Sequence, residues 1–97
     1  MNDVEVCCTL GASDLQEQAR RWDTLRQHAE VRQVETPSGK RLHFAAGDGV
    51  ADELDALVAV ERTCCAWASW TVVREGDEVV LDVASSGEGV AVIRQMF

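Results

Sequence analysis

The spacing of apolar residues along the first third of the chain predicts a strand followed by a helix. In residues 4–10, apolar and polar positions alternate, which is typical of a strand with one buried face. Ser13 and Gln16 then form a capping-box pattern that indicates the start of a helix. The apolar residues that recur at spacings of three and four, and predict one buried stripe on this helix, are Leu15, Ala19, Trp22, Leu25 and Ala29.

The rest of the chain repeats a hairpin-and-helix pattern. Residues 31–35 and 40–45 predict a hairpin around the turn sequence Thr36-Pro37-Ser38-Gly39, with Leu42 and Phe44 facing the core. Residues 69–74 and 78–84 predict a second hairpin, and residues 90–97 a short closing helix. Between the hairpins, residues 50–65 predict a helix, whose inner face carries Ala51, Leu54, Leu57, Val58 and Glu61.

These elements follow one another in the order β-α-β-β-α-β-β-α, in one domain spanning residues 1–97. Helices with a single apolar stripe need an apolar sheet face to cover. The sequence therefore predicts an α+β fold, a two-layer sandwich with the helices on one face of a mainly antiparallel sheet.

Composition narrows the environment and the partners of the protein. Seventeen acidic residues against nine basic ones give a net charge of −8, which disfavours nucleic acid and anionic membranes as partners. No apolar run is long enough to span a membrane, and the acidic start lacks the features of a secretory signal. We therefore expect a cytoplasmic protein with four reduced cysteines, as a monomer or a homodimer.

The candidate chemistry lies in two pairs of adjacent cysteines, Cys7-Cys8 and Cys64-Cys65. Neighbouring cysteines rarely bond to each other, because the ring that they would close is strained. On its strand, Cys8 is expected to face the core and Cys7 to face outward. The alternative for Cys8, and for Cys64 and Cys65 together, is filler in the core, which is a common role for buried cysteine.

Glu61 precedes the second cysteine pair by three and four residues, so it lies on the same side of the predicted helix as both thiols. Its place in the apolar stripe turns it toward the core, where a carboxylate is costly unless it is paired, hydrogen-bonded or protonated. The alternative is a side chain that curls out to solvent or caps a backbone group. Of the nearby tryptophans, we expect one of Trp67 and Trp70 in the core and the other outside it.

Grouped thiolates select soft ions, and the candidates are Hg(II), Cu(I), As(III), Zn(II) and Cd(II). The predicted ligands are Cys8, Cys64, Cys65 and Cys7, with Glu61 supporting them without binding the ion itself. The spacing is not that of a standard zinc motif. His28 and His43 lie apart from the cysteines and are expected to have surface or structural roles.

The segment Glu61-x-x-Cys64-Cys65-x-Trp67 resembles a group of small bacterial proteins that carry an E-x-x-C-C-x-aromatic motif before a closing hairpin and short helix. The resemblance covers residues 51–97 best, and Cys8 also fits it. Trp67 departs from the expected phenylalanine. The resemblance implies an association with resistance to thiophilic metals.

Three functions therefore remain open. The leading one is a binding protein for a soft metal or metalloid ion. The second is an enzyme that uses the cysteine pair and Glu61 on an organometallic or disulfide substrate. The helix end around Cys64 and Cys65 argues against redox catalysis, because its partial negative charge disfavours thiolates. The third is a structural or interaction domain with inert buried cysteines.

Overall fold

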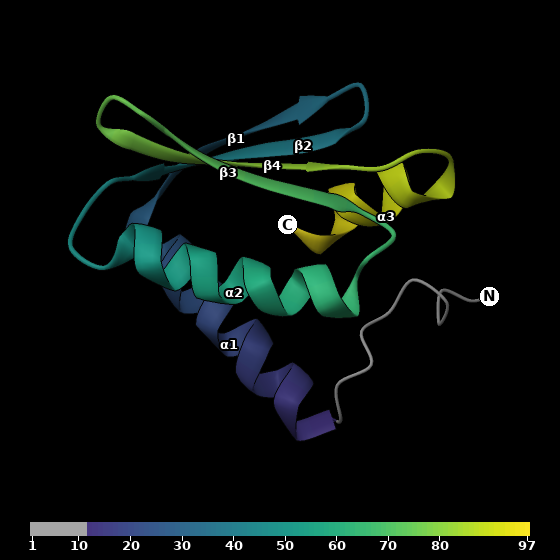
Figure 1. Ribbon diagram of the computed structural model, residues 1–97, viewed down its shortest axis with the longest axis horizontal. Helices are drawn as coiled ribbons and strands as arrows, with labels where there is room; N and C mark the ends of the chain where they lie inside the picture. Colours follow the sequence, from purple (N-terminus) through teal and green to yellow (C-terminus); the bar gives the residue numbers. More distant parts are fainter. Residues whose placement is uncertain (1–11) are drawn as a thin grey trace.

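The computed structural model describes residues 12–97, and it has the α+β architecture that the sequence predicts (Figure 1). The predicted first strand, with Cys7 and Cys8, lies outside the described residues. The described elements are α1 (Ala12–Ala29), β1 (Glu30–Thr36), β2 (Gly39–Ala45), α2 (Val50–Cys64), β3 (Ser69–Glu75), β4 (Glu78–Ala84) and α3 (Glu88–Met96).

The four strands form one antiparallel sheet with the order β1-β2-β4-β3. Each predicted hairpin is present, and α2 connects the two. The hairpins meet along their second strands, where Leu42 pairs with Leu81 and Phe44 with Val79. All four of these side chains are fully buried, so the junction of the two hairpins is also the centre of the core.

The three helices cover one face of the sheet (Figure 1). The opposite face carries polar cross-strand pairs, as is common for antiparallel sheets with one solvated side. Arg41 bonds to Asp82 across β2 and β4, and His43 bonds to Glu78 in the same way. The predicted two-layer arrangement is therefore confirmed for the described residues.

From residue 16 to the end of α1, the buried stripe differs from the predicted one at Ala19. Trp22, Leu25 and Ala29 are buried as predicted, but Ala19 is exposed and Gln18 is buried in its place. Positions 18, 22, 25 and 29 keep the helical spacing of four and three. The prediction at Ala19 was wrong because it rested on apolar character alone, whereas the polar side chain of Gln18 occupies the inner position.

An aromatic cluster joins α1, β3 and the end of the chain. Trp22 packs against Phe97 with ring centroids 5.3 Å apart and against Trp70 at 6.5 Å. Of the two tryptophans that follow the second cysteine pair, Trp70 is buried and Trp67 is only partly buried. The cluster fixes α1 against the sheet beside the last turn of α2.

Candidate functional site

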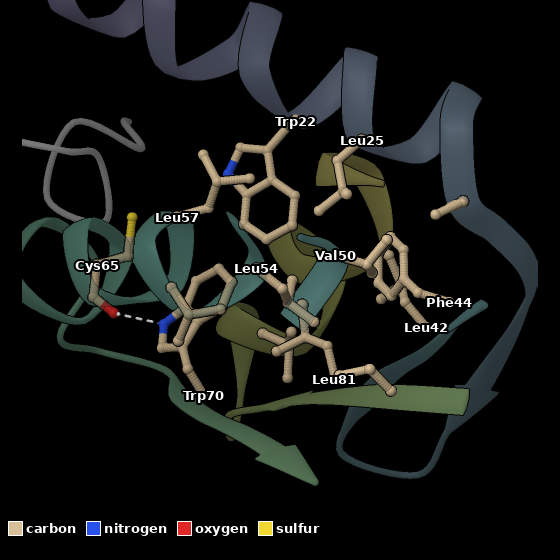
Figure 2. Close-up of a cluster of buried hydrophobic side chains, with 14 of the residues drawn as sticks. Trp22, Leu25, Leu42, Phe44, Val50, Leu54, Leu57, Cys65, Trp70 and Leu81 are labelled. Atoms are coloured by element: carbon tan, nitrogen blue, oxygen red, sulfur yellow. Dashed lines mark hydrogen bonds between the residues drawn. The ribbon is translucent and has the colours of Figure 1, made fainter. Parts of the chain in front are cut away.

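The second cysteine pair lies where α2 ends and the chain turns toward β3. Cys64 is the last residue of the helix, and the backbone N–H of Cys65 still donates to the carbonyl of Glu61 at 2.6 Å. The carbonyl of Cys65 accepts a hydrogen bond from the Trp70 indole at 3.2 Å (Figure 2). It accepts a second one from the backbone N–H of Ala68 at 3.1 Å. These bonds fix the backbone that carries the Cys65 thiol.

Glu61 points into the protein, as predicted, and only 6% of it is exposed. Its Oε2 accepts hydrogen bonds from Gln18 Nε2 and from Trp22 Nε1, both at 2.9 Å. Its Oε1 accepts a hydrogen bond from the Cys65 thiol at 3.4 Å. One oxygen of the carboxylate is thus held by α1, and the other faces the cysteine.

Hydrogen bonds lower the cost of burying a carboxylate, and Gln18 and Trp22 supply them. Gln18 Nε2 also donates to the carbonyl of Leu57 at 3.1 Å, which anchors the amide on α2. In the part of the chain that the structure describes, the three side-chain donors to Glu61 are neutral groups. Within residues 12–97, no lysine or arginine forms an ion pair with this carboxylate.

The arginines closest to the site have other partners. The guanidinium of Arg62 donates two hydrogen bonds to the carbonyl of Trp70, at 2.7 and 3.1 Å. Arg21 forms a two-bond pair with Glu53 across the α1–α2 interface, at 2.8 and 3.0 Å. The hydrogen bonds from Arg21 hold the pKa of the Glu53 carboxyl below its usual value, and the same pairing raises the pKa of Arg21.

Both cysteines of the second pair are buried, Cys64 with 8% and Cys65 with 5% of its surface exposed. Cys64 is disulfide-bonded. The expectation that all four cysteines are reduced therefore does not hold for Cys64. The structure brings Glu61, Cys64 and Cys65 together at one helix end, while the predicted ligands Cys7 and Cys8 lie outside the described residues.

The two histidines are not part of this site. His28 is exposed at the end of α1. His43 lies on the outer face of the sheet, where its Nδ1 bonds to Glu78 at 2.9 Å and only 7% of the residue is exposed. The hydrogen bond from His43, together with Arg32, lowers the pKa of Glu78. The structural role expected for His43 agrees with this arrangement.

The part of the chain that the structure describes contains no group of three or more His, Cys, Asp or Glu side chains arranged to hold a metal ion. The closest arrangement is the contact between Glu61 and Cys65. Sequence reasoning missed two contributors to it, the amide of Gln18 and the indole N–H of Trp22. A glutamine in line with Trp22, Leu25 and Ala29 was the available signal for the first.

Comparison with protein-family models, with curated proteins and with solved structures finds no match to this chain. Among residues 12–97, no helix has the length and apolar character needed to cross a membrane.

Proposed function

We propose that the protein binds a soft metal or metalloid ion through the thiolates of Cys64 and Cys65. The observation that carries the proposal is the buried carboxylate of Glu61, which lies 3.4 Å from the Cys65 thiol and, among residues 12–97, accepts side-chain hydrogen bonds from neutral donors only. A buried anion without a cationic partner favours a cation that arrives beside it. The thiolates select which cation binds, because soft ions prefer sulfur.

The surroundings of the two thiols support the same proposal. The C-terminal end of a helix carries partial negative charge, which favours a bound cation. The excess of acidic residues, with a net charge of −8, adds a long-range attraction for cations. Cys8 and Cys7 complete the ligand set that we propose, and Hg(II), Cu(I), As(III), Zn(II) and Cd(II) are the candidate ions.

The reduced protein is the binding form in this proposal. The disulfide at Cys64 takes up two electrons and two protons from a dithiol reductant, which is itself oxidised to a disulfide, and the Cys64 thiol is freed. Metal binding then displaces thiol protons. The proposal places the protein in a reducing compartment, such as the cytoplasm.

Native mass spectrometry of the reduced protein, with the five ions offered in competition, tests the proposal. We expect one ion per chain, and we expect Cys64→Ser and Cys65→Ser to lose it, because serine offers a hard oxygen in place of a soft sulfur. Thr63→Ser, at an exposed position on the same helical turn, is the matched control and should bind like the wild type. Failure of the reduced wild type to bind any ion, or full binding by both cysteine variants, would refute the proposal.

The disulfide at Cys64 favours one second candidate, thiol–disulfide exchange. In this reaction a substrate thiolate attacks the Cys64 sulfur, forms a mixed disulfide with it, and displaces the sulfur to which Cys64 was bonded as a thiolate. Equilibration of the protein with mixtures of reduced and oxidised glutathione measures the reduction potential of the disulfide. A potential within the glutathione range supports exchange, and a disulfide that the glutathione pool cannot reduce excludes it.

A further inference from the structure

The contact between Glu61 and Cys65 has dimensions that suit a shared metal ion. Zinc binds thiolate sulfur at about 2.3 Å and carboxylate oxygen at about 2.0 Å, so at a tetrahedral angle the two ligand atoms lie about 3.5 Å apart. Glu61 Oε1 and Cys65 Sγ are 3.4 Å apart. An ion can therefore replace the thiol proton between these two atoms with almost no movement of either side chain.

The other oxygen of the carboxylate holds the group in this orientation. Oε2 is bonded to Gln18 and Trp22, both at 2.9 Å, and these donors come from α1, a different element from the cysteines. Partners of this kind orient a ligand toward its metal and strengthen binding. Because Oε2 is held, Oε1 stays directed at the Cys65 sulfur.

We propose that Glu61 is a ligand of the bound ion, and that its carboxylate adds more to the affinity for borderline divalent ions, Zn(II) and Cd(II), than to the affinity for Hg(II) and Cu(I). This inference rests on the proposed function and changes the role first expected for Glu61, which was to support the ligands without coordinating. One carboxylate oxygen combined with thiolate sulfur is a donor set that zinc accepts. Hg(II) and Cu(I) favour sulfur alone and gain little from the carboxylate. Cys64, once reduced, supplies a further thiolate.

The first test compares Glu61→Gln with the wild type in the reduced state, by competition of each protein with a chelator for Cd(II) and with a small thiol for Hg(II). Glutamine keeps the size of the side chain and removes the anionic oxygen. We expect the affinity for Cd(II) to fall at least 100-fold and that for Hg(II) less than tenfold. Glu53→Gln, on the same helix but paired with Arg21, is the matched control and should leave both affinities unchanged.

An equal loss for both ions, or no loss for either, would overturn the inference while leaving the proposed function in place. The proposed function itself fails if the reduced wild type binds none of the ions, or if both cysteine variants bind them fully. A second measurement needs no variant and so does not depend on the folding of Glu61→Gln. X-ray absorption of the zinc complex of the wild type should show oxygen at the carboxylate distance together with sulfur, and a shell of sulfur alone would contradict the inference.

Discussion

Trp22 provides the sharpest test of how α1 supports the site, because its side chain has two separable roles. The ring packs against Phe97 and Trp70, and the indole N–H donates to Glu61 Oε2 at 2.9 Å. Trp22→Ala removes both roles. Trp22→Phe keeps an aromatic ring in the cluster and removes only the donor and part of the ring volume.

The structure sets the expected magnitudes. Truncation of a large buried aromatic residue to alanine costs about 3–5 kcal/mol of unfolding free energy, and Trp22 is 7% exposed. Loss of a hydrogen bond to a charged group costs about 1.5–3 kcal/mol. We therefore expect Trp22→Phe to lose about 1.5–3 kcal/mol and Trp22→Ala clearly more.

Urea denaturation followed by far-UV circular dichroism measures both variants, since that signal does not depend on the tryptophan removed. The hydrogen bond is then isolated by repeating Trp22→Phe in a Glu61→Gln background. There the donor faces a neutral acceptor, so the same change should cost less. A Trp22→Phe variant within about 0.5 kcal/mol of the wild type, or a cost unaffected by Glu61→Gln, would refute the assigned role of the N–H.

Two further predictions concern the scaffold. Gly39→Ala should lower the free energy of unfolding by about 1–3 kcal/mol or more in urea denaturation, because the added Cβ would collide with the backbone carbonyl of Val83. Gly47→Ala, whose Cβ would have ordinary contacts only, should stay within about 0.5 kcal/mol of the wild type, and equal costs at the two glycines would contradict the packing described. The pairing of Glu53 with Arg21 lowers the folded-state pKa of Glu53 below its ordinary value of 4.5, so its stabilising contribution is complete above pH 4.5 and is lost as the pH falls through the lowered pKa. The difference in urea midpoint between the wild type and Glu53→Gln should accordingly shrink on acidification, and a difference that grows would show that the pair does not stabilise the fold.

The elements and layers of this fold were accessible from the sequence because they rest on local signals. The turn around Pro37 and Ser38 separates two alternating segments, and β1 and β2 lie on either side of it. The helical spacing of Leu54, Leu57 and Val58 placed Glu61 on the inner side of α2, where it lies. Each of these predictions needed only a period and a turn signal.

The hydrogen-bond partners of Glu61 could not be predicted from local sequence signals. Gln18 and Trp22 are 43 and 39 residues away along the chain, and their contacts arise only when α1 packs on α2. Because Gln18 is polar, it does not belong to an apolar pattern, and the pattern pointed to Ala19 as the inner residue instead. A buried polar network depends on tertiary packing, so its members do not follow an apolar pattern.

The order of the strands also required the structure. Two hairpins joined by a helix can meet along several pairs of edges, and the sequence did not distinguish among them. In the fold, β2 and β4 meet, which puts the fully buried Leu42 and Leu81 side by side. This junction leaves β1 and β3 as the edges of the sheet.

The central claim is that reduced Cys64 and Cys65 hold a metal ion beside Glu61. Its most direct test is a titration of the reduced wild type with Cd(II), followed by the ultraviolet charge-transfer absorption that arises when thiolate sulfur binds cadmium. The account predicts a signal that rises linearly, saturates at one ion per chain and is lost in Cys65→Ser. Absence of the signal in the wild type, or its full retention in Cys65→Ser, would contradict the account.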